Sequence, residues 1–196
     1  MVEIKVNLVQ EKSYPCIEFV SDERFGKKFL KGFNFKIVEE DKNQKIYVSL
    51  MKDEMKLASK VLELIKNLKL SNVCIDVSKL KTKNLFLESL YLSAYEFDKY
   101  KTKKEEKEIR IGIYGMEKSE FIISKTISKA VYIARDLGNE PGNKLYPQAF
   151  VEKVYQIFED EPNVLIEVLD EIQLEKEGLR GILLVGDSSV HKPRLL

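Results

Sequence analysis

Strand-type runs alternate with helix-type stripes along most of the chain, and this alternation is the strongest constraint on its fold. Apolar residues alternate with polar ones, or run together over a few positions, at residues 2–8, 16–20, 33–38, 45–51, 73–77, 108–115, 164–169 and 181–186. Apolar residues instead recur every three or four positions at residues 54–70, 83–97, 119–137, 147–158 and 171–178. Strands and helices in this order predict an α/β fold, with a mixed sheet flanked by helices.

Several residues predict where the helices begin and end. Asp53 and Thr82 are suited to N-cap positions, and Asp170 with Gln173 has the spacing of a capping box. Gly138 is suited to the C′ position after the long third helix, where a positive φ costs glycine little. Residues 21–28, 39–44 and 99–107 are predicted to be turns or charged connections.

Composition excludes some classes of protein. Hydrophobic residues make up 44% of the 196 positions and charged residues 33%, with a net charge of +1. This balance argues against a general polyanion-binding surface and leaves a local basic patch open. Cys16 and Cys74 are far apart in sequence, and Cys74 lies in an apolar run, so we expect it to be a small buried residue in a reducing cytoplasm. No signal peptide or membrane-spanning run is present.

A search for catalytic groups assigns no catalytic, cofactor-binding or metal-binding residue. His191 is the single histidine and stands in a polar loop, so we expect a surface residue and no paired-histidine zinc site. The carboxylates of Glu39–Asp41 and Glu159–Glu161 follow one another in turns, where they point apart and stay hydrated rather than converge on a metal. The basic 99–107 segment carries Tyr100 and could touch phosphate, but its glutamates dilute its positive charge.

One stretch resembles a known family. The long helix is predicted to end in Ala134-Arg-Asp-Leu, followed by Asn139-x-Pro141-x-Asn143 and then by Pro147. This order resembles the leucine aminopeptidase family of cytosolic two-metal exopeptidases. Further segments resemble the same family, in its order, at residues 88–101, 168–178 and 185–196. Together the matches cover about residues 45–196.

Four positions depart from the family pattern. Tyr146 stands where the family has a helix-capping threonine, so we expect a weaker N-cap there. Ser188 and Ser89 each stand where the family has glycine, and Lys192 replaces the first proline of a pair. These departures indicate a divergent member.

The resemblance implies a division of the chain. Residues 1–118 would form a macro-like N-terminal α/β domain, residues 119–137 a connecting helix, and residues 138–196 the opening of a truncated α/β catalytic domain. In this reading Ile182 to Val185 would be an exposed apolar strand edge. Arg135 and Asp136 would be structural residues that anchor the helix end.

The family's metal ligands and its catalytic Lys and Arg follow the Pro-Arg-Leu segment, which here is Pro193 to Leu195. No position of this chain matches them. The complete family enzyme is a cytoplasmic hexamer that uses two divalent ions, zinc or manganese, to remove N-terminal residues from peptides. The resemblance therefore implies the N-terminal portion, or a shortened relative, of a leucyl aminopeptidase that is inactive on its own.

Alternatives of other classes stay open. The chain could be a non-catalytic module that binds duplex DNA or an ADP-ribose-like ligand, since relatives and macro-like domains include such binders. It could also be an assembly module that associates with itself or with a paralogous subunit.

Overall fold

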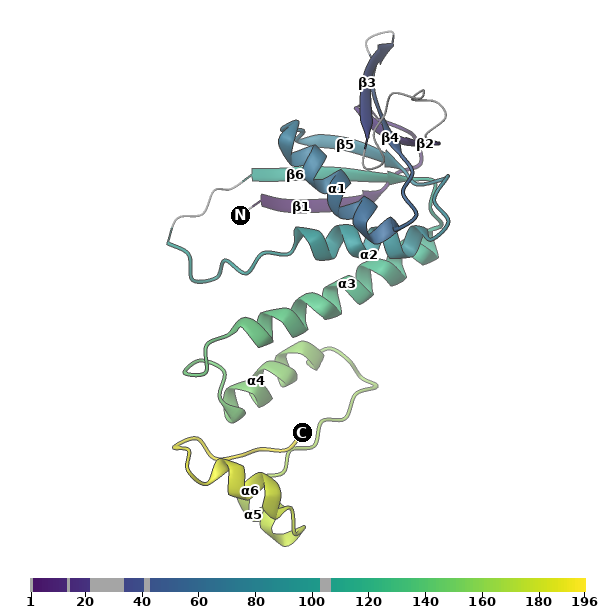
Figure 1. Ribbon diagram of the computed structural model, residues 1–196. Coiled ribbons are helices and arrows are strands. Elements are labelled where there is room, and N and C mark those ends of the chain that lie inside the picture. Colours follow the sequence, from purple (N-terminus) through teal and green to yellow (C-terminus); the bar gives the residue numbers. More distant parts are fainter. Residues whose placement is uncertain (1, 14, 22–33, 41–42, 103–106) are drawn as a thin grey trace. The chain divides into compact units, whose positions relative to one another are not determined.

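A computed structural model describes residues 2–13, 15–21, 34–40, 43–102 and 107–196 (Figure 1). Residues 22–28 of the predicted 21–28 loop, and parts of the predicted 39–44 and 99–107 connections, lie outside these residues. The chain forms two compact units, an N-terminal unit of Met1–Ala134 and a C-terminal unit of Arg135–Leu196.

The N-terminal unit is built on a six-stranded sheet with the order β1-β6-β5-β2-β4-β3. Its strands are β1 (Val2–Leu8), β2 (Cys16–Val20), β3 (Phe35–Glu40), β4 (Asn43–Ser49), β5 (Asn72–Asp76) and β6 (Lys107–Tyr114). β3 pairs with β4 in the antiparallel direction, and the other neighbouring pairs are parallel. The predicted mixed sheet and α/β class are therefore confirmed.

The described residues form six helices. They are α1 (Glu54–Asn67), α2 (Lys83–Ala94), α3 (Lys118–Asn139), α4 (Pro147–Phe158), α5 (Glu171–Lys176) and α6 (Arg180–Gly186). Asp53 caps α1 by accepting hydrogen bonds from the backbone N–H groups of Met55 and Lys56, both at 3.1 Å. The predicted capping box of Asp170 and Gln173 is also confirmed at α5.

Thr82 precedes α2 as predicted but does not cap it with its side chain. Its hydroxyl and backbone N–H instead donate to the carboxylate of Glu54, the N–H at 2.9 Å. Glu54 opens α1, so this carboxylate ties the starts of two helices together. α2 also ends at Ala94 rather than at Phe97, because Tyr95 adopts an extended backbone.

One face of the sheet carries the hydrophobic core. Side chains alternate between faces along a strand, so Ile17, Ile46, Ile75 and Ile113 share one face, and all four are fully buried. α1 and α2 pack on each other and supply the facing residues Leu57, Val61, Leu62, Ile65, Phe86, Leu87 and Leu90. The rings of Phe19 and Phe86 meet edge to face, with centroids 5.5 Å apart.

The packed face of α3 differs from its apolar stripe. Ile123 and Ile127, which help to predict the helix, are 58% and 44% exposed. The buried residues of α3 are instead Phe121, Ser124 and Ser128. Ser128 donates a hydrogen bond from its hydroxyl to the Ser124 carbonyl at 2.8 Å. The buried hydroxyl of Ser124 has no hydrogen-bond partner among the described residues, so this small polar face is only partly satisfied.

Two predicted strands of the C-terminal unit are wrong. Residues 164–169 form no strand, and only Leu169 makes an isolated antiparallel bridge, with Leu195. Residues 181–186 lie in α6, so the expected strand edge at Ile182 to Val185 is a helix instead. A four-residue apolar run fits either a strand or a buried turn of helix, and periodicity alone does not separate them.

Gly138 is a further correction. α3 continues through it to Asn139, and Gly138 is not among the glycines with positive φ. A carbon added at its Cβ position would meet no atom within 4 Å.

Among the described residues, no helix is both long and apolar enough to cross a membrane.

Replacing Gly138 by alanine should therefore stabilise the protein, because alanine restricts the unfolded chain and suits a helix interior. We expect a gain of about 0.5–1 kcal/mol in the free energy of unfolding, measured by urea denaturation. A loss of stability would instead indicate that residue 138 has a positive φ, in the left-handed region of the backbone.

Gly115→Ala is the matched comparison. Gly115 has a φ of +83°, and an added Cβ would lie 2.9 Å from the Ser78 Cβ. We expect this variant to lose about 1–3 kcal/mol in the same measurement.

Candidate functional site

The segment that joins α3 to α4 is an ordered turn, as predicted. Pro141 accepts hydrogen bonds at its carbonyl from the backbone N–H groups of Lys144 and Leu145, at 2.8 and 3.0 Å. Pro147 then occupies the first turn of α4, where its missing N–H costs nothing. Arg135 and Asp136 are exposed near the end of α3, and their anchoring role stays a prediction.

Arg194 ties together three parts of the C-terminal unit. Its Nη1 lies 2.5 Å from the Glu171 carboxylate at the start of α5, and its Nε donates to Gln148 Oε1 in α4 at 3.3 Å. Next to it, the backbones of Leu195 and Leu169 exchange hydrogen bonds of 2.8 and 3.1 Å. One guanidinium thus holds the final segment against α4 and α5.

Gly186 and Pro193 form a second contact of the same segment. A Cβ added at Gly186 would lie 2.8 Å from the Cβ and Cγ of Pro193, closer than carbon atoms approach. Pro193 is one of the buried residues of the C-terminal unit. The turn between them therefore depends on glycine at position 186.

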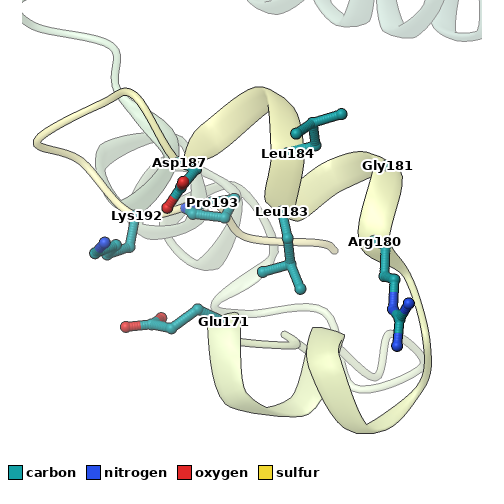
Figure 2. A pocket seen from close by; sticks show the side chains of 8 residues that line it. All are labelled: Glu171, Arg180, Gly181, Leu183, Leu184, Asp187, Lys192 and Pro193. Atoms are coloured by element: carbon teal, nitrogen blue, oxygen red, sulfur yellow. The ribbon is translucent and has the colours of Figure 1, made fainter.

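A pocket of about 420 Å³ lies between α5, α6 and this segment (Figure 2). Its lining residues are Glu171, Arg180, Gly181, Leu183, Leu184, Asp187, Lys192 and Pro193. Lys192, Asp187 and Glu171 lie on one side of the pocket and Arg180 on the other, with Leu183 between them (Figure 2). The rim thus carries both signs of charge around an apolar floor.

The carboxylates of the described residues do not form a metal centre. No group of three or more His, Cys, Asp or Glu side chains among those residues is arranged to hold a metal ion. Glu39 and Glu159–Glu161 are exposed, as turn carboxylates should be, while Asp41 lies outside the described part of the chain. The part of the chain that the structure describes thus offers no three-residue group of this kind for a two-metal site.

Comparison with protein families identifies the C-terminal unit. Residues 132–196 match the family described as the cytosol aminopeptidase family, catalytic domain. A probable cytosol aminopeptidase of Rhizobium johnstonii is 34% identical over 157 residues, which cover 73% of this chain and 31% of that protein. One of Clostridium perfringens is 33% identical over 149 residues, covering 62% of this chain and 30% of the relative. The chain belongs to the cytosol aminopeptidase family.

Solved structures of family members share the fold. A cytosol aminopeptidase from Coxiella burnetii superposes with a TM-score of 0.72 at 16% identity, over 96% of this chain and 44% of that one. A tomato leucine aminopeptidase mutant gives a TM-score of 0.70 at 11% identity, over 99% of this chain and 50% of that one. The chain spans less than a third of the length of the two curated relatives named above.

The departure at Tyr146 from the aminopeptidase pattern has a structural counterpart. Tyr146 is the N-cap of α4 and makes no side-chain capping hydrogen bond, as predicted. Its ring instead stacks on the imidazole of His191, with centroids 4.0 Å apart and planes 10° from parallel. His191 is exposed, as predicted for a loop histidine, and its contact is with this ring.

A cluster of charged residues lies on the second face of the sheet in the N-terminal unit. The sequence analysis did not predict it. Lys12 lies in the β1–β2 connection, which spans residues 9–15 and is described apart from residue 14. Its Nζ is 2.6 Å from Asp76 Oδ2 and 3.0 Å from Glu18 Oε1. The same Nζ lies 5.4 Å above the centroid of the Tyr114 ring. Glu18 and Asp76 are charged residues inside apolar strands, and this was the signal in the sequence. Only the register of β2 and β5 shows that the two carboxylates are neighbours.

The charges of this cluster stabilise one another. Burial by itself would lower the pKa of Lys12, but hydrogen bonds and charge from Asp76 and Glu18 outweigh it and raise that pKa. Burial likewise would raise the pKa of Asp76, but Lys12 and Ser78 lower it overall. Because the carboxylate is favoured in the folded state, its stabilisation is present at neutral pH and is lost as the pH falls through the lowered pKa.

Arg194→Ala should loosen the end of the C-terminal unit, because it removes the ion pair to Glu171 and the hydrogen bond to Gln148. We expect faster hydrogen exchange at the backbone amides of Leu169 and Leu195. Arg180→Ala, which removes an exposed arginine from the pocket rim, is the matched control and should leave both amides protected. Equal exchange in the two variants would contradict the role given to Arg194.

Proposed function

We propose that this chain supplies the N-terminal portion of a metal-dependent cytosolic aminopeptidase. The N-terminal unit would be its non-catalytic domain, and the C-terminal unit the opening of its catalytic domain. The observation that carries this proposal is the match of residues 132–196 to the family's catalytic domain. That match begins within α3, close to the boundary between the units after Ala134.

We propose further that residues 1–196 do not hydrolyse peptides on their own. The aminopeptidase chemistry of the family needs two divalent ions, zinc or manganese, which activate a water molecule and stabilise charge on the peptide carbonyl. The described residues offer no carboxylate group suited to such ions. We propose that the metal ions are held by residues outside this set.

An assembly role is favoured by the surface of the C-terminal unit. Its apolar side chains at Leu165, Leu184, Val185 and Val190 are between 81% and 94% exposed. Its buried residues are few, namely Val151, Leu174 and Pro193. Exposed apolar area of this kind is stabilised when another protein surface covers it. We propose that a second copy or a paralogous subunit is the cover, in a cytoplasmic oligomer of the family's kind.

The binding alternatives named from the sequence, duplex DNA and an ADP-ribose-like ligand, stay predictions. A salt-sensitive gel shift would support the first. A rise in the melting temperature with ADP-ribose would support the second.

The purified chain should release no leucine from leucyl dipeptides in the presence of Zn²⁺ or Mn²⁺. A complete relative, such as the probable cytosol aminopeptidase of Clostridium perfringens, serves as the positive control. Metal-dependent release by residues 1–196 would contradict the proposal. A chimera in which these residues replace the matching part of that relative should recover metal-dependent release.

Leu184→Glu combined with Val185→Glu should weaken association of the chain, because two exposed apolar side chains become charged. Covering a leucine contributes about 2 kcal/mol, so the dissociation constant should rise at least about tenfold in sedimentation experiments. Lys153→Glu on α4 changes the net charge by the same amount without removing apolar area, and it should leave association unchanged. An unchanged constant in the double variant would exclude this surface.

A further inference from the structure

Cys16 and Cys74 are direct neighbours across the middle of the sheet. They are register partners in the parallel pair of β2 and β5. Both thiols are free, and both side chains are fully buried. Register partners project from the same face of a sheet, with Cβ atoms about 5 Å apart. The two residues are 58 positions apart in the sequence, so no short spacing motif indicates the pairing.

The pair lies on the face that carries the charge cluster. Ile17 and Ile75 belong to the hydrophobic core on the other face, and the alternation along each strand turns the cysteines away from it. Among the described residues, the β1–β2 connection lies on this face: its Lys12 is ion-paired with Asp76 and Glu18, and its Ser13 backbone N–H donates to the Cys74 sulfur.

The two thiols differ chemically. The pKa of Cys74 is lowered to about 7, because a hydrogen bond from the Cys16 thiol outweighs burial, helped by the Ser13 backbone N–H and the charge of Lys12. The same hydrogen bond, together with burial, raises the pKa of Cys16. The Cys16 sulfur also lies 3.9 Å from the Ile17 carbonyl oxygen, a second acceptor for its proton.

Among the described residues, the charged groups that act on Cys74 are Lys12 and Asp76 of this cluster. Lys12 favours the thiolate, whereas Asp76 disfavours it, and Glu18 adds negative charge near Cys16. Lys12 is held between these two carboxylates by the ion pairs described above. The fixed ammonium group therefore keeps one cation close to a sulfur that is itself hydrogen-bonded, and both features favour the thiolate of Cys74.

We propose that Cys74 is a peroxide-reactive thiol and that Cys16 resolves it, so that the two form a reversible disulfide between β2 and β5. The oxidant is a small hydroperoxide, because the buried position excludes bulky disulfides. This role is independent of the aminopeptidase assignment.

The reaction balances in two steps. The Cys74 thiolate attacks one oxygen of hydrogen peroxide, the O–O bond breaks, and the hydroxide that leaves takes a proton to become water. The sulfur is thereby oxidised to a sulfenic acid. The Cys16 sulfur then attacks that sulfur, the S–OH bond breaks, and a second water carries away the thiol proton. Overall two thiols and one peroxide give one disulfide and two waters.

The test uses the whole chain with hydrogen peroxide at neutral pH, followed by alkylation of free thiols in denaturant and by mass mapping. We expect a mass loss of two hydrogens, one peptide pair joining Cys16 to Cys74, and full reversal by dithiothreitol. The rate should rise with pH through about 7, as Cys74 loses its proton. Unmodified thiols under these conditions, or a link between two chains, would overturn the proposal.

Single substitutions separate the two roles. Cys16→Ser should leave Cys74 as a sulfenic acid that a cyclic diketone probe labels, with no internal link. Cys74→Ser should slow peroxide consumption by about tenfold or more, because the remaining thiol stays protonated. Equal reactivity of the two variants would also overturn the assignment of roles. Circular dichroism before oxidation checks that each variant is folded. If a variant is not folded, the mass mapping of the oxidised wild-type chain decides the proposal.

Discussion

A strand buried on both faces needs two covers, and β5 sets this requirement for the whole N-terminal unit. It lies between β6 and β2, and its residues from Val73 to Asp76 are all buried. On one face α1 and α2 supply an aliphatic cover. On the other face the described residues that lie over the strand belong to the β1–β2 connection, and there the strand carries the Asp76 carboxylate. Burying that carboxylate without a partner would be costly, so Lys12 is as necessary to the second face as the leucines are to the first.

The sequence predicts the N-terminal unit well for a physical reason. Its strands alternate clearly, its first helix is amphipathic over four turns, and Asp53 is a strong cap, so local preferences and tertiary packing agree. The cover on the second face could not be predicted in the same way. Lys12, Glu18 and Asp76 meet only because β2 and β5 are neighbours in one register, and that register is a property of the folded sheet.

Prediction was weaker in the C-terminal unit, where local signals compete. The apolar run from Ile182 to Val185 suits a strand, but α6 needs no partner strand to satisfy its backbone. Glycine often ends a helix, but α3 continues through Gly138 to Asn139. Gly138 has no positive φ and no close neighbour, so this position does not require glycine. The short-range signals that succeeded, Pro147 and the Asp170 capping box, are those that depend only on the first turn of a helix.

Each unit is stabilised internally by a different kind of contact. The N-terminal unit has a contiguous core of aliphatic and aromatic residues. The C-terminal unit relies on a capping box, one guanidinium and a two-bond bridge. Contacts of this kind are individually worth about 1 kcal/mol, so they open locally more often than a core does. The part of the chain that matches the family's catalytic domain is therefore the part whose structure depends most on what surrounds it.

The place of β1 in the sheet has a consequence for folding during synthesis. β1 pairs with β6 alone, so that Val2 lies opposite Lys107 and Leu8 opposite Ile113. During synthesis β1 therefore waits for β6, about a hundred residues later in the chain, before it gains this partner. Until then Ile4, Val6 and Leu8 remain an unpaired apolar edge on the nascent chain. Long-range pairing of this kind is slow and prone to aggregation, so β1 is the strand of this sheet with the longest need for protection by a chaperone.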